Sequence, residues 1–204
     1  MCAIQPAVRP TAKRPAAAPR GSPSAARNAT SAASTFGAGC PASAHADPYA
    51  AVLAGLAALS GPRHGAASDR AEALVAEIES SGDAARVLHE RERRGELVAG
   101  FGHPFYPGGD PRARLLLETA RGLGARSRTA AAAFATIDAM AAAGRPAPNV
   151  DMALVALRAT LGLPRGAAAG LFAVGRSAGW IAHILEQYAA GFLLRPRARY
   201  RRED

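Results

Sequence analysis

Residues 110–126 read DPRARLLLETARGLGAR, and this stretch decides the fold class. Asp110 stands where a helix N-cap is expected, and Pro111 follows at the first helical position. A short side chain that accepts backbone N–H bonds, followed by a ring with a fixed φ angle, is a strong helix start. The stretch therefore predicts a helix that begins beside Asp110.

The segments before and after this stretch also have sequence patterns typical of helices. The segment 69–80 opens with Asp69 and has Glu72 three residues later, a pattern typical of a capping box. No run of alternating β-branched residues predicts a strand. We therefore expect an all-α protein with six or seven helices. The other predicted helices cover residues 48–59 (PYAAVLAGLAAL, expected to be buried), 83–95, 128–143, 149–162 and 166–190.

Composition sets the broad class. A chain of 204 residues with 49% apolar residues can form one domain with a real core, or two small ones. Cys2 and Cys40 lie far apart, which indicates neither a disulfide framework nor a metal site. No apolar run looks long enough to span a membrane, and no signal peptide is visible. The expected location is the cytoplasm, without membrane contact.

Residues 1–47 differ from the rest of the chain. They are rich in Ala, Pro, Ser and Arg, and no acidic residue precedes Asp47. Such a low-complexity segment without apolar periodicity is expected to be mostly disordered. Its composition is also that of an organelle transit peptide, although its prolines argue against the amphipathic helix that such peptides form.

The net charge of +9 raises the question of a nucleic-acid partner. Lys13 is the only lysine among the 25 basic residues, so the charge is almost entirely arginine. These arginines are not gathered into one basic helix with aromatic partners, as a nucleic-acid surface requires. We therefore expect no nucleic-acid partner and keep this class as the weakest alternative.

Three loops each hold one ionisable residue among small or apolar neighbours. Two histidines and a carboxylate form a general acid–base set. Each residue also has a structural explanation. His64 is then a loop histidine with a satisfied ring, His103 stacks on an aromatic ring, and Asp151 lies at the positive end of a helix dipole. The loops are 61–65, 100–113 and 148–157, and they hold His64, His103 and Asp151.

Taken together, the motifs resemble one family. In chain order, four stretches resemble the catalytic half of citrate synthases, and the closing RPRARY (195–200) resembles that family's C-terminal signature. A weaker similarity starts at ASTF (33–36). The four stretches are GPRHGAAS (61–68), GFGHPFYPGGDPRA (100–113), PNVDMAL (148–154) and LFAVGRSAGWIAHILEQ (171–187).

The resemblance implies a reaction and a role for each loop residue. The family condenses acetyl-CoA with oxaloacetate and then hydrolyses citryl-CoA to citrate and CoA. By position, Asp151 matches the base that removes the methyl proton. His64 matches the histidine that donates a hydrogen bond to the thioester oxygen, where negative charge develops. His103 matches the histidine that polarises and protonates the oxaloacetate carbonyl.

The resemblance also implies how the substrates are held. Arg112 and Arg176 match carboxylate-binding arginines, and Arg195 matches one that a neighbouring subunit contributes. Arg176 lies among apolar residues, so its charge is expected to need an anionic partner. The loop 105–109 lies where the family wraps the CoA nucleotide, yet it contains no basic residue. Acetyl-CoA is then a substrate, and we expect no permanently bound cofactor and no metal.

The family's proteins are much longer than this chain. Residues 64–160 would correspond to their small domain, and residues 48–63 and 161–204 to parts of their large domain. Two interpretations follow: an active acyltransferase, as a homodimer, or a catalytically silent subunit that pairs with a longer homologue. Because 2-methylcitrate synthases share these motifs and use propionyl-CoA, the acyl donor has two candidates.

Overall fold

The computed structural model of the protein describes residues 32–61 and 64–195. Within these ranges it contains eight α-helices and, apart from one isolated bridge between Phe101 and Pro148, no β-structure, so the all-α prediction is confirmed. The helices are α2 (Ala33–Ser43), α3 (Pro48–Leu59), α4 (Ala67–Ser81), α5 (Ala84–Arg93), α6 (Pro111–Leu123), α7 (Arg128–Ala142), α8 (Val150–Thr160) and α9 (Ala167–Ala190).

The helix starts follow from capping side chains. Asp110 accepts the backbone N–H of Arg112 at the start of α6, as its sequence predicts, and Asn149 caps α8 in the same way. The capping box predicted for α4 is wrong. That helix begins two residues before Asp69 and has no side-chain cap, and Glu72 is buried against other elements.

The prediction that residues 1–47 lack regular structure fails for α2. This helix begins at Ala33, the first residue of the ASTF stretch, and packs against α3 and α9. Ala38 and Ala42 are fully buried there. Small side chains allow close helix packing, so a segment of low-complexity composition can still supply a buried face. Residues 1–31 lie outside the described part of the chain.

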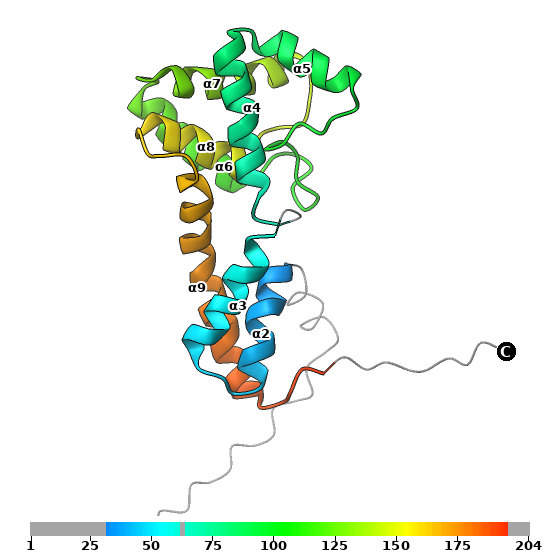
Figure 1. Ribbon diagram of the computed structural model, residues 1–204, viewed down its shortest axis with the longest axis vertical. Helices are drawn as coiled ribbons and strands as arrows, with labels where there is room; N and C mark the ends of the chain where they lie inside the picture. Colours follow the sequence, from blue (N-terminus) through cyan, green and yellow to red (C-terminus); the bar gives the residue numbers. More distant parts are fainter. Residues whose placement is uncertain (1–31, 62–63, 196–204) are drawn as a thin grey trace, which may run out of the picture.

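The helices form two lobes with separate cores (Figure 1). The upper lobe contains α4 to α8 and a core that includes Leu74, Val155 and Met152. The lower lobe contains α2, α3 and most of α9, around the fully buried ring of Trp180. The long α9 runs from one lobe into the other, and the segment between α3 and α4 also joins the two lobes.

An ion cluster anchors α9 to the upper lobe. Glu72 on α4 and Arg158 on α8 are both buried, and their side chains form a 3.2 Å ion pair. Glu72 also accepts the backbone N–H of Gly166, which is the N-cap of α9. A negative charge at this end of a helix interacts favourably with its dipole. The start of α9 is thereby held against α4 and α8.

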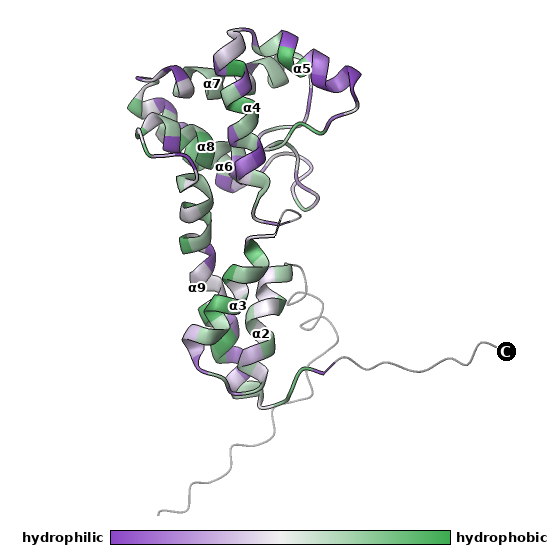
Figure 2. Ribbon diagram, viewed as in Figure 1, coloured by the Kyte–Doolittle hydropathy of each residue, from purple (hydrophilic) through white to green (hydrophobic). Residues whose placement is uncertain are grey.

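Parts of the lower lobe remain uncovered. Contrary to the prediction of a buried helix at 48–59, Tyr49 and Leu53 of α3 are exposed. On α9, Val174 and Leu185 are exposed as well, and Figure 2 shows hydrophobic residues along both helices. By length and composition alone, α9 could cross a membrane, whereas the sequence predicts no such segment. However, α9 contains Arg176 and packs on α2, α3 and α8.

Close packing against Trp180 gives a test of the lower lobe. A Cβ at Gly55 would lie 3.0 Å from Cδ2 of Trp180 and 3.3 Å from Cβ of Ala38. Gly55→Ala should therefore destabilise the chain by about 1–3 kcal/mol, since overpacking outweighs the better helix propensity of alanine. Gly170→Ala, on the open side of α9, should stabilise the chain by up to about 1 kcal/mol.

Urea unfolding followed by the fluorescence of the single tryptophan measures both changes. If Gly55→Ala were as stable as Gly170→Ala, the packing described for Trp180 would be wrong.

Candidate functional site

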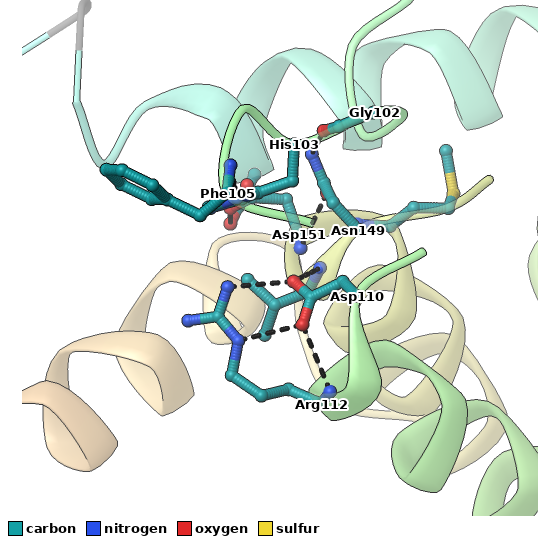
Figure 3. Close-up of polar contacts among 10 residues, drawn as sticks. Gly102, His103, Phe105, Asp110, Arg112, Asn149 and Asp151 are labelled. Carbon is teal, nitrogen blue, oxygen red and sulfur yellow. Dashed lines mark hydrogen bonds and ion pairs between the residues drawn. The ribbon is translucent and has the colours of Figure 1, made fainter. Parts of the chain in front are cut away.

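The start of α8 is tied to the loop that carries His103. The Asn149 side chain accepts the backbone N–H groups of Asp151 and Met152 through Oδ1, and its Nδ2 donates to the carbonyl of Gly102 at 3.1 Å. The backbone of the loop pairs with the same segment, because the N–H of Asn149 donates to the carbonyl of Gly100 at 2.9 Å. One cap residue thus brings His103 close to the first turn of α8 (Figure 3).

Asp110 joins the start of α6 to the same place. Its carboxylate accepts two hydrogen bonds from the Arg112 guanidinium, at 2.9 and 2.8 Å, and the backbone N–H of Val150 at 3.1 Å (Figure 3). Burial acts to raise the pKa of Asp110, but the bonds from Arg112 outweigh it and hold that pKa below its ordinary value. Asp110 therefore stays ionised and orients Arg112.

Asp151 lies in the first turn of α8, and the described part of the chain places one side-chain donor, a neutral one, on its carboxylate. The hydroxyl of Ser68, in the first turn of α4, donates to Oδ1 at 2.6 Å. Burial raises the pKa of Asp151 above its ordinary value, and the Ser68 bond and the charges of Arg112 and Arg70 only partly offset this. A partly buried carboxylate with a raised pKa has the properties of a general base.

His64 lies in the segment between α3 of the lower lobe and α4 of the upper lobe. Its Nε2 is 2.7 Å from the hydroxyl of Ser34, a fully buried residue near the start of α2. Burial lowers the pKa of His64, the charge of Arg176 lowers it further, and the charge of Asp151 acts in the opposite direction. The ring is therefore neutral at pH 7, and His64, Arg176 and Asp151 are electrostatic neighbours.

The ring of His103 has a defined protonation pattern. The backbone N–H of Phe105 donates to Nδ1 at 3.1 Å, so Nδ1 carries the lone pair and the proton of the neutral ring lies on Nε2. The ring also packs near those of Phe105 and Tyr106, and the Arg112 guanidinium lies over Tyr106. His103 is thus a hydrogen-bond donor held next to Arg112.

The anionic partner expected for Arg176, a ligand or a side chain, is not supplied by a described side chain. Its guanidinium donates to the hydroxyl of Thr35 on α2, and within residues 32–61 and 64–195 it forms no ion pair with a carboxylate. Gly179, one turn further along α9, lies directly beside the guanidinium. A partly buried cation that has only a neutral partner can accept an anionic ligand.

Within the described residues, no hydrogen bond or ion pair joins Arg195 to the other predicted site residues. Arg195 is exposed and follows the end of α9, where the chain leaves the lower tip of the molecule (Figure 1). Nearby Leu194 lies against Gly39, in the second half of α2. The rest of the RPRARY motif lies outside the described residues, as does Arg63. The described chain therefore gathers His64, His103, Asp151, Arg112 and Arg176, but not Arg195.

Two serines belong to the arrangement and were missed from the sequence as site residues. Ser34 lies in the ASTF stretch, and Ser68 closes the GPRHGAAS motif, so both stand in segments that the sequence had already marked. Neither could be identified alone, because each acts on a residue 30 or 83 positions away.

Three helix N-termini meet at this site. Ser68 lies in the first turn of α4, Arg112 in that of α6 and Asp151 in that of α8, and hydrogen bonds join these turns. Unpaired N–H groups and the helix dipoles make such ends electropositive and favour anions. Within the described ranges, no group of three or more His, Cys, Asp or Glu residues could hold a metal ion.

Two hollows adjoin the His103 loop. A small one of about 20 Å³ is lined by His103, Tyr106 and Asn149, among others. A larger one of about 550 Å³ extends along α6 and contains Arg114 and Leu117 in its wall. Both hollows share Gly109 and Pro148, so they meet where the loop approaches the start of α8.

Comparisons with known proteins identify the family of the chain. The family model described as citrate synthase, C-terminal domain, matches residues 28–197. The citrate synthase of Haloferax volcanii is 37% identical over 172 residues, which are 82% of this chain and 45% of that protein. The chain thus spans less than half the length of this curated relative.

Two solved structures are similar throughout most of the chain. The citrate synthase of Thermoplasma acidophilum, in a ternary complex with carboxymethyl coenzyme A and oxaloacetate, gives a TM-score of 0.69 at 31% identity, over 84% of this chain and 48% of that one. The citryl-CoA lyase of Hydrogenobacter thermophilus gives a TM-score of 0.70 at 25% identity, over 85% of this chain and 72% of that one.

The raised pKa of Asp151 means that the ionised form of this side chain lowers the stability of the fold. The folded chain holds a proton on Asp151 more readily than the unfolded chain, whose ordinary value is 3.8. The ionised carboxylate therefore costs stability above its folded-state pKa, and this cost disappears as the pH falls toward 3.8. Asp151→Asn should raise the midpoint of thermal unfolding at pH 7, by roughly 2–4 °C for each kcal/mol removed.

The gain from Asp151→Asn should shrink between pH 7 and pH 4, which thermal unfolding followed by circular dichroism can measure. Asp69→Asn is the matched control, since Asp69 is exposed in the first turn of α4. An Asp151→Asn chain less stable than wild type at pH 7 would contradict the assignment of burial as the dominant effect.

Proposed function

Because the chain belongs to the citrate synthase family, we propose that it carries the catalytic residues for condensing acetyl-CoA with oxaloacetate to citrate and CoA. The supporting observation is Asp151: a partly buried carboxylate with a raised pKa, which among residues 32–61 and 64–195 is hydrogen-bonded by a side chain on one oxygen, beside a neutral histidine and two arginines. This is the environment that proton abstraction from a thioester methyl group requires.

In the proposed reaction, Asp151 removes a methyl proton from acetyl-CoA. His64 donates a hydrogen bond to the thioester oxygen, on which negative charge develops. If the Ser34 hydroxyl donates to Nε2 of His64, the ring proton lies on Nδ1 and is available for this purpose. The lowered pKa of His64 keeps the ring neutral, so it can stabilise the enolate without protonating it.

The second half of the proposed reaction takes place at oxaloacetate. Nε2–H of His103 hydrogen-bonds to the ketone oxygen, and the enolate carbon attacks the ketone carbon while His103 transfers its proton to that oxygen. Arg112 and Arg176 bind the carboxylates of oxaloacetate, since a guanidinium can form two parallel bonds with a carboxylate. Water then hydrolyses citryl-CoA to citrate and CoA.

The proposal extends to the CoA moiety and to assembly. The loop 105–109 and the adjoining hollows are the proposed contact for the nucleotide part of acetyl-CoA. Arg195, which is remote from the other site residues of its own chain, would serve the site of a second copy in a homodimer. The cytoplasm is the proposed compartment, and propionyl-CoA is the alternative acyl donor.

Two observations favour alternatives to this proposal. The chain covers 72% of the citryl-CoA lyase structure, a larger share than it covers of the citrate synthases, and cleavage of citryl-CoA reverses the condensation step. The exposed apolar residues of α3 and α9 favour a silent subunit that pairs with a longer homologue.

A thiol-release assay tests the proposal directly. Purified chain with acetyl-CoA should release CoA only when oxaloacetate is present. Asp151→Asn should lower the rate by about 10²–10⁴-fold, since the amide cannot accept the methyl proton. His64→Ala should lower it by about 10²-fold through loss of an oxyanion donor. Arg176→Met should raise the KM for oxaloacetate.

Asp69→Asn is the control and should retain the wild-type rate. Thiol release that survives Asp151→Asn unchanged would mean that Asp151 is not the base. An inactive wild type that cleaves citryl-CoA would favour the lyase, and one inactive in both directions would favour the silent subunit.

The proposed assembly has its own test. Leu185 is 61% exposed on α9, so Leu185→Glu should change no contact within the core of one chain. In a dimer that covers this face, the buried charge should shift the sedimentation of the protein toward the monomer, with dissociation enhanced at least tenfold. Glu186→Lys, at an exposed polar position of the same helix, is the control. A wild type that already sediments as a monomer would refute the homodimer.

A further inference from the structure

Ser68 uses its hydroxyl in an unusual way. A serine in the first turn of a helix commonly hydrogen-bonds its own backbone and so stabilises the helix start. Here α4 has no side-chain cap, and the Ser68 hydroxyl instead donates to Asp151, 83 residues further along the chain. Ser68 is 1% exposed and the bond is 2.6 Å long, so water does not compete for the donor.

We propose that Ser68 is a positioning residue for Asp151, which holds Oδ1 of the carboxylate so that Oδ2 is presented to the proton being removed. This role rests on the proposed function of Asp151 as a base. A carboxylate can turn about its Cβ–Cγ bond, and a single short hydrogen bond to one oxygen removes that freedom. Correct orientation before the reaction is a large part of the advantage of a positioned catalytic group.

The surroundings of Asp151 explain why one donor matters. Arg112, on α6, and Arg70, on α4, favour its ionised form by their charges, whereas Asp110 disfavours it. His64, in the segment before α4, is a further titratable neighbour of Asp151, and His103 lies close to the same turn of α8. Among the interactions that lower the pKa of Asp151 and so oppose the effect of burial, the hydrogen bond from Ser68 is the largest. It comes from a neutral group.

A neutral donor suits a base better than a cation in direct contact would. Asp110 shows the contrast, because the Arg112 guanidinium bonds both of its oxygens and lowers its pKa. A carboxylate bonded in that way is a weak base and has no free oxygen for a substrate. Ser68 orients Asp151, leaves one oxygen free and adds no charge.

The test compares Ser68→Ala with the wild-type chain by two measurements. In the first, the carboxyl ¹³C signal of Asp151 is titrated in the full chain by NMR, with Asp151→Asn used to assign it. Loss of the bond to the ionised form should move the midpoint to higher pH. In the second, the rate of thiol release is measured against pH. The rate on the plateau should fall about tenfold, with the acidic limb moved to higher pH and the KM for oxaloacetate unchanged.

Two further variants separate positioning from packing. Ser68→Thr keeps the hydroxyl and should restore the midpoint of the titration toward the wild-type value. Ser43→Ala removes another buried serine hydroxyl, which donates to the carbonyl of Cys40 on α2, and should change neither the midpoint nor the rate.

An Asp151 titration that is identical in wild type and Ser68→Ala would overturn the proposal, whether or not the chain is active. An unchanged plateau rate in an active chain would overturn it too. If the wild type releases no thiol but the midpoint still moves, the coupling of Ser68 to Asp151 is supported and the proposed condensation fails.

Discussion

The site depends on the side chain of Asn149. This residue caps α8 with one end of its amide and holds the carbonyl of Gly102 with the other. The same segment receives the carboxylate of Asp110, through the backbone N–H of Val150. Because a cap side chain must lie within hydrogen-bond distance of the first turn, these contacts leave little freedom in the relative placement of His103, Arg112 and Asp151. Motifs that lie far apart in the sequence therefore meet at a single helix start.

Two aspartates at helix starts illustrate how surroundings set chemistry. Asp110 and Asp151 are both buried to some degree, and burial acts on both in the same direction. Asp110 also receives two bonds from a guanidinium and two from backbone N–H groups, and its pKa falls. Within the described ranges, Asp151 receives a serine hydroxyl as the sole side-chain donor to its carboxylate, and its pKa rises. Pairs of groups whose environments separate their pKa values divide structural and catalytic roles.

The site also draws on both lobes. Ser68, His103, Arg112 and Asp151 belong to the upper lobe, whereas Ser34, Thr35 and most of α9 belong to the lower one. Arg176 lies on the helix that connects them (Figure 1). A dicarboxylate held by Arg112 and Arg176 would therefore join the lobes, and the anchoring of α9 by Glu72 and Arg158 limits how far they can move apart.

The sequence by itself determined the helical class, most helix starts and the motifs that hold His64, His103 and Asp151, because caps, prolines and helical periodicity act over a few residues. The resemblance also implied Arg112 and Arg176 as site residues, which stays a prediction. The sequence misjudged α2, α3 and the start of α4, whose burial or capping depends on what packs beside them. Only the tertiary structure decided that Ser34 and Ser68 serve the site and that Arg195 lies apart from it. The reason is that hydrogen bonds and desolvation join atoms across space, between residues that local sequence patterns do not connect.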